Sequence, residues 1–128
     1  MSDIMPETHR ERVSKNPYQG SFKRVLCICS GGVLRSPTVA WILSNPPYNR
    51  NTRCAGSEDY ALVPVDQVLL DWADELVFLG QSNLHAASRK FLINTKVFVL
   101  KIPDRFAYRD PELVVEILAA LKRESFPE

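Results

Sequence analysis

Four short segments along the chain have the length of a β-strand. Three of them are almost continuously apolar rather than alternating between apolar and polar residues. Continuous apolar character is typical of strands that are buried on both faces, as in a parallel sheet. The runs occupy residues 23–28, 51–55, 76–79 and 97–100. The pattern therefore predicts four parallel strands.

Helical signals fill the segments between these runs. A capping side chain followed by proline at the first helical position marks two helix starts, and a pair of prolines ends the first helix. The last helix carries apolar residues at helical spacing on one face. The predicted helices are one that starts at Ser36 and Pro37, two over residues 64–70 and 81–91, and one that starts at Asp110 and Pro111.

Strands and helices alternate along the chain, which favours an α/β fold. We expect a three-layer sandwich, in which a four-stranded parallel sheet has helices on both faces. Residues 1–21 are polar and lack apolar periodicity, so they predict a flexible N-terminal arm. Residues 22–128 are predicted to form a single domain.

Composition narrows the class of protein. The chain has 128 residues, of which 45% are hydrophobic and 24% charged, as is usual for a globular domain. A net charge of +1 gives no reason to expect a nucleic-acid partner. No apolar stretch approaches the roughly 18 residues of a membrane span. Three cysteines in no even framework, without a recognisable secretory signal, predict a protein of the reducing cytoplasm.

A glycine-rich turn follows the first apolar run, and Cys29 and Arg35 bracket it. A loop that runs from a strand into a helix N-terminus can aim several backbone N–H groups inward, where they and the helix dipole favour an anion. The Arg35 side chain adds a planar, two-pronged donor. The residues between the two are Ser30, Gly31, Gly32, Val33 and Leu34. This stretch is predicted to be a phosphate-binding loop.

The same loop would activate a thiol. A cysteine at a helix N-terminus beside a cation is held as the nucleophilic thiolate. Backbone donors and the Arg35 guanidinium can hold the oxygens of a phosphoryl group while the Cys29 sulfur attacks phosphorus. Ser36 can donate a hydrogen bond to the thiolate. This chemistry requires no metal ion or other cofactor. The alternative is that Cys29 is a plain core residue at the end of a strand.

A phosphoryl transfer of this kind also needs a general acid, and Asp104 is the best candidate. Asp104 follows the last predicted strand, so it should reach the same sheet edge as Cys29. Asp74 and Glu75 precede a strand and therefore belong to the opposite edge, and Asp110 is better explained as a helix N-cap. The alternative for Asp104 is an exposed turn residue.

These residues also carry a resemblance to a known family. Residues 25–40 resemble the N-terminal signature of the low-molecular-weight protein tyrosine phosphatases, whose loop reads Cys-x-Gly-Asn-x-Cys-Arg-Ser-Pro. Residues 53–57 resemble the family's Ser-Ala-Gly-Thr strand end, and residues 102–106 its Val-Pro-Asp-Pro-Tyr segment. The family places its acid far downstream of the cysteine, as Asp104 is here. The resemblance implies the family's fold and its catalytic assignment of Cys29, Arg35 and the downstream aspartate.

The chain departs from the family pattern at three positions. Gly32 replaces an asparagine, and glycine adopts positive φ easily but supplies no side-chain hydrogen bond to brace the loop. Leu34 replaces a second loop cysteine, so the disulfide that shields the nucleophile in relatives cannot form. Cys27 is an unsuitable substitute, because its place on the strand predicts that it faces the core. Arg105 replaces the proline that follows the acid.

Aromatic residues are candidates for the walls of the site. Phe106 matches the family's aromatic residue near the acid and could stack on a phenyl ring, while Tyr108 and Tyr48 could line the entrance. Plain packing is the alternative for each of them. The predicted substrate-binding set is Ser30, Gly31, Gly32, Val33, Leu34, Ser36, Phe106 and Tyr108.

The sequence thus predicts a metal-independent, cysteine-dependent phosphatase that acts on phosphotyrosine or a related phosphomonoester, in a protein or a small molecule, through a phosphocysteine intermediate. One alternative is a binding module that holds a phosphorylated ligand without turnover. A less favoured one is an arsenate reductase, which needs further redox cysteines, whereas Cys54 is the only cysteine after the loop.

Overall fold

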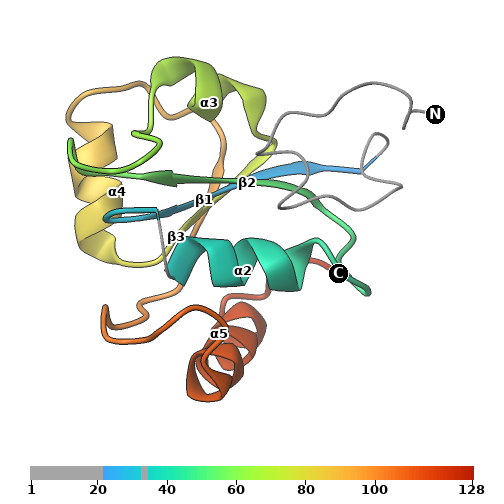
Figure 1. The fold of residues 1–128 in the computed structure, drawn as a ribbon. Helices are drawn as coiled ribbons and strands as arrows, with labels where there is room; N and C mark the ends of the chain where they lie inside the picture. The colour runs from blue at the N-terminus through green and yellow to red at the C-terminus, as the bar shows by residue number, and fades with distance from the viewer. Residues whose placement is uncertain (1–21, 33–34) are drawn as a thin grey trace, which may run out of the picture.

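A four-stranded parallel sheet forms the centre of the protein (Figure 1). The computed structural model describes residues 22–32 and 35–128, so the predicted N-terminal arm and the loop residues Val33 and Leu34 lie outside the described residues. The strands are β1 (Arg24–Cys29), β2 (Asn51–Gly56), β3 (Glu75–Phe78) and β4 (Lys96–Val99), in the order β2-β1-β3-β4. All three pairings are parallel, as predicted.

Helices cover both faces of this sheet. Figure 1 shows α2 and α5 below the strands and α3 above them, and Ala87 of α4 packs in the same core cluster as Leu69 and Leu70 of α3. Their bounds are α2 (Arg35–Leu43), α3 (Gln67–Trp72), α4 (Gln81–Ser88) and α5 (Pro111–Arg123). The three-layer α/β sandwich expected from the sequence is therefore confirmed.

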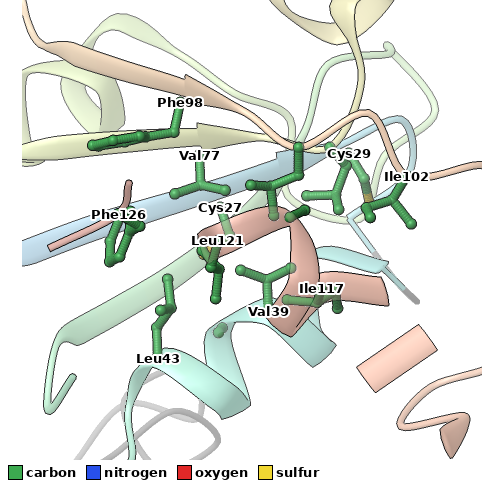
Figure 2. Close-up of a cluster of buried hydrophobic side chains, with 14 of the residues drawn as sticks. Cys27, Cys29, Val39, Leu43, Val77, Phe98, Ile102, Ile117, Leu121 and Phe126 are labelled. Atoms are coloured by element: carbon green, nitrogen blue, oxygen red, sulfur yellow. The ribbon is translucent and has the colours of Figure 1, made fainter. Parts of the chain in front are cut away.

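The core is divided into two clusters by the sheet. Successive residues of a strand point to opposite faces, so Val25, Cys27 and Cys29 of β1 pack against α2 and α5, whereas Leu26 and Ile28 pack against α3 and α4. All five side chains are buried, which explains why the run is apolar without alternation. Figure 2 shows the first cluster, which extends from Phe126 and Leu43 at one end to Cys29 and Ile102 at the other.

Two helix starts follow their capping side chains. The Asp110 carboxylate accepts a hydrogen bond from the Glu112 N–H at 2.8 Å, with Pro111 in the first turn, so the predicted start of α5 is confirmed. Helix α3 starts at Gln67 rather than at residue 64. The reason is that the Asp66 carboxylate accepts from the Leu69 N–H at 2.8 Å and fixes the first turn there.

The predicted capping role of Ser36 is wrong. Helix α2 starts at Arg35, so Ser36 already lies in its first turn. The Ser36 side chain is completely buried, and its hydroxyl contacts the Cys29 sulfur. The N-terminus of α2 therefore meets the end of β1 through a side-chain contact.

Candidate active site

Cys29 is the last residue of β1, and polar groups contact its sulfur. The Gly32 N–H donates to Cys29 Sγ at 3.1 Å, and the thiol donates to Ser36 Oγ at 3.2 Å. The residue is 2% exposed and also belongs to the core cluster, where Figure 2 shows it beside Ile102. A cysteine that served only to fill the core would need apolar neighbours alone. The two polar contacts fit a thiol at the floor of the loop.

Arg35 and Asp104 meet at the same sheet edge. The Arg35 side chain donates through Nη1 to the Ile102 carbonyl at 2.7 Å, and its Nε lies 3.4 Å from Asp104 Oδ1. Arg35 is 4% exposed, whereas the Asp104 side chain is 64% exposed. Among the described residues, no acceptor makes a hydrogen bond with Nε. The guanidinium is therefore buried with one nitrogen that makes no hydrogen bond with the described residues, and Asp104 lies at the sheet edge predicted for it.

The first part of the loop lies directly against the end of β2. Gly32 has a φ of +72°, which glycine adopts easily, and a Cβ atom there would approach the Ala55 carbonyl carbon to 2.9 Å. A Cβ atom at Gly56 would lie 2.5 Å from the Ser30 carbonyl oxygen. Two backbone hydrogen bonds continue this contact, from the N–H of residue 57 to Cys29 O at 2.8 Å and from the N–H of residue 58 to Ser30 O at 3.1 Å. Glycine at both positions permits this close approach.

Asn83 is a member of the site that sequence reasoning missed. Its side chain is 1% exposed and lies in the first turn of α4, directly after β3. The Asn83 Nδ2 donates to Ser30 Oγ at 3.1 Å and to Ser57 Oγ at 3.0 Å. A usable signal was present, because β3 neighbours β1, and a polar residue just after β3 must emerge at the same edge as Cys29.

The aromatic candidates have different environments. Phe106 is 3% exposed and packs in the core cluster, with the Arg105 guanidinium 4.2 Å from its ring centroid, so the packing alternative applies to it. Tyr108 is partly exposed and lies under the Arg109 guanidinium at 5.0 Å. Tyr48 packs edge-on against Phe126 at the other end of the cluster, so its predicted place at the entrance is wrong.

The other two cysteines are set apart from this chemistry. Cys27 is fully buried on the core face, as predicted, and its register partner on β2 is Cys54. Burial raises the pKa of the Cys27 thiol well above its usual value, and the neighbouring Cys54 and Cys29 raise it further. None of the three is in a disulfide. Cys27 is therefore held as an unreactive thiol.

The competing carboxylates lie at the opposite edge, as predicted. Asp74 pairs with Arg24 at 3.3 Å, just before β3 starts. Glu75 is buried and pairs with Arg50 at 3.0 Å. Both carboxylates are thus held in ion pairs at the amino ends of the strands, away from Cys29.

Within the described residues, no group of three or more histidine, cysteine, aspartate or glutamate side chains is arranged to hold a metal ion. None of the helices described has the length and apolar character needed to cross a membrane. No protein-family model, curated protein or solved structure matches this chain.

Proposed function

We propose that this protein is a cysteine-dependent phosphatase similar to the low-molecular-weight tyrosine phosphatases, and that it hydrolyses phosphotyrosine or a related phosphomonoester. The environment of the Cys29 sulfur carries the proposal. A backbone N–H and the Ser36 hydroxyl contact the sulfur at 3.1 and 3.2 Å, where they can stabilise a thiolate. A buried arginine and an exposed carboxylate lie at the same edge.

The first step transfers the phosphoryl group to sulfur. The Cys29 thiolate attacks phosphorus, the bond to the leaving oxygen breaks, and Asp104 gives its proton to that oxygen. The Arg35 guanidinium and the loop N–H groups hold the three phosphoryl oxygens, over which negative charge is spread in the transition state. Asp104 is suited to this proton transfer because its side chain is largely exposed and can meet a substrate.

The second step releases phosphate. Asp104, now ionised, takes a proton from water as the water oxygen attacks phosphorus and the phosphorus–sulfur bond breaks. The electron pair returns to the Cys29 sulfur, and the Ser36 hydroxyl stabilises this thiolate by turning its proton toward it. The carboxylate is thereby reprotonated for the next turnover.

A binding module that retains a phosphorylated ligand is the second candidate, and two observations favour it. Cys29 is only 2% exposed, and Asp104 is engaged with Arg35 rather than unpaired. A module of this kind would use the loop donors and Arg35 for the anion without any attack by sulfur.

Steady-state hydrolysis of 4-nitrophenyl phosphate and phenyl phosphate, with EDTA present, distinguishes the two candidates. We expect wild-type turnover that Cys29→Ser abolishes, with Cys54→Ser as the matched control that retains it. Asp104→Asn should lower kcat by about 10²–10⁴-fold on phenyl phosphate. The loss should be smaller on the nitrophenyl ester, because its leaving oxide needs protonation less.

Vanadate, added to the same assay, competes with the aryl phosphate for the site, and its inhibition of hydrolysis or its direct binding measures the affinity of the site for an anion. Turnover that survives in Cys29→Ser would refute the proposed nucleophile. Tight vanadate binding without any wild-type turnover would instead identify the binding module.

A further inference from the structure

We infer that Asn83 is a positioning residue for residues 30–32, the described part of the predicted phosphate-binding loop, and that it acts through the Ser30 side chain. Asn83 supplies from α4 a side-chain hydrogen bond to the loop, which Gly32 cannot supply because glycine has no side chain. The inference rests on the proposed function, since a loop matters for catalysis only if it holds the reacting phosphoryl group.

Asn83 connects three segments that are distant in the sequence. One proton of its Nδ2 goes to Ser30 in the loop at 3.1 Å and the other to Ser57 after β2 at 3.0 Å. The backbone of residues 57 and 58 in turn donates to the carbonyls of Cys29 and Ser30. Loop, helix and strand end are thereby joined in a closed ring of hydrogen bonds around the residue that follows the nucleophile.

The hydrogen bonding of Asn83 is one-sided. Both protons of the amide nitrogen are used, whereas Oδ1 is buried without a hydrogen-bond partner in the described part of the chain. A buried acceptor without a partner lowers stability. Stability alone does not explain an asparagine at this position, because its buried Oδ1 has no hydrogen-bond partner among the described residues. The arrangement is explained if the side chain serves to hold Ser30 in place.

The position of Ser30 matters because the loop donors must already point at the phosphoryl oxygens when charge develops on them. Donors that are fixed in advance stabilise the transition state without a cost of reorganisation. A looser loop would still admit the substrate but would align fewer donors during the reaction. Loss of the brace should therefore lower kcat more than it changes KM.

The test is the kinetics of Asn83→Ala on 4-nitrophenyl phosphate together with its affinity for vanadate, a mimic of the transition state. We expect kcat to fall about 10–100-fold with KM changed less than about threefold, and vanadate affinity to fall in parallel with kcat/KM. Ser30→Ala combined with Asn83→Ala should be no worse than Asn83→Ala alone, because the two act through one contact.

Ser44→Ala is the matched control for stability. Ser44 is also buried and donates to the Trp41 carbonyl at 3.0 Å, but it lies beyond the far end of α2. It should leave kcat and vanadate affinity unchanged. If Asn83→Ala does not fold, Ser57→Ala removes the other anchor of the amide and should produce a smaller loss in the same direction.

Kinetic constants and vanadate affinity equal to the wild type in Asn83→Ala, or fully additive losses in the double variant, would overturn the inference. Failure of the proposed function is a separate outcome. If the wild type binds vanadate without turnover, only the catalytic proposal fails, and weaker vanadate binding by Asn83→Ala still supports the brace. A wild type that neither hydrolyses the ester nor binds vanadate overturns both.

Discussion

Two arginines are buried at opposite edges of the sheet, and their surroundings differ in kind. Arg50, at the amino edge, pairs through Nε with the buried Glu75 carboxylate at 3.0 Å. It also donates to the Tyr48 carbonyl at 2.8 Å and to the carbonyls of residues 127 and 128 at the end of the chain. Its guanidinium lies 5.0 Å from the centroid of the Phe126 ring. The donors of Arg50 are thus used by the protein itself.

Arg35, at the carboxyl edge, is as deeply buried as Arg50 but makes fewer hydrogen bonds with the described residues. One nitrogen donates to the Ile102 carbonyl, and the ion pair with Asp104 leaves Nε without a hydrogen bond among the described residues. The partner carboxylate is itself exposed. The two arginines are therefore equally buried, but they differ in how many of their N–H groups donate hydrogen bonds to the described residues. A buried cation with unused donors is a candidate for ligand binding, and a fully used one is a structural element.

Replacement of Arg50 should produce the largest change in stability. Arg50→Met leaves the Glu75 carboxylate buried, and among the described residues the remaining cation paired with it is the Lys23 ammonium at 3.9 Å. Loss of one partner of a buried ion pair costs about 3–5 kcal/mol in the free energy of unfolding. Urea unfolding monitored by tryptophan fluorescence measures this loss.

The activity of the Arg50→Met protein is the control. Because Arg50 is remote from Cys29, kcat/KM per folded molecule should equal that of the wild type. An unfolding free energy within about 1 kcal/mol of the wild type would contradict the structural role given to Arg50.

Replacement of Arg35 should produce the opposite pattern. Arg35→Lys keeps the charge but not the planar fork, so kcat/KM should fall about 10²–10³-fold, as when one transition-state donor is lost. The free energy of unfolding should change by only about 1 kcal/mol, because the exposed Asp104 side chain is resolvated by water. Kinetics and urea unfolding of the same preparation measure both. If Arg35→Lys is much less stable but fully active, Arg35 has a structural role like that of Arg50 and no role in binding the ligand.

Local patterns in the sequence were enough to predict the sheet, its parallel strands and the edge at which both Cys29 and the Arg35–Asp104 pair lie. Apolar runs report burial on both faces, and strand ends in a parallel sheet fix which side chains share an edge. The start of α2 was missed because Ser36 followed by Pro37 has the sequence of a cap, while tertiary contact with Cys29 takes its hydroxyl instead. A local capping preference is overridden where a tertiary contact, here with the Cys29 sulfur, engages the side chain instead.

Partners that are distant in the sequence could not be predicted in the same way. Arg35 meets the Ile102 carbonyl 67 positions away, and Asn83 meets Ser30 53 positions away. Each contact depends on how far a loop extends after its strand and on which rotamer the side chain adopts. The burial of Phe106 beneath Arg105 likewise depends on packing that no local pattern reports.

Replacement of Asp74 should produce the smallest change in the free energy of unfolding. Its ion pair with Arg24 lies at the same edge as the Arg50–Glu75 pair but is exposed to water. The Arg24 N–H and side chain hydrogen-bond to this carboxylate and lower its pKa in the folded protein. A carboxyl group whose pKa is lowered by folding stabilises the folded state at pH values above its unfolded pKa of about 3.9. This stabilisation is lost as the pH falls through the pKa of the folded state. Because the side chains of Asp74 and Arg24 are both more than a third exposed and screened by water, the contribution should be only about 0.2–1 kcal/mol.

Urea unfolding of the wild type and Asp74→Asn should therefore differ by this amount at about pH 6, and the difference should shrink as the pH is lowered below about 4. Added salt should reduce the part that comes from charge, whereas the much larger Arg50→Met effect should respond to salt far less, because its ion pair is buried. A difference for Asp74→Asn that grows toward acid pH would reverse the sign of the linkage. It would mean that the folded protein holds this carboxyl group in its protonated form, although three Arg24 nitrogens donate hydrogen bonds to it.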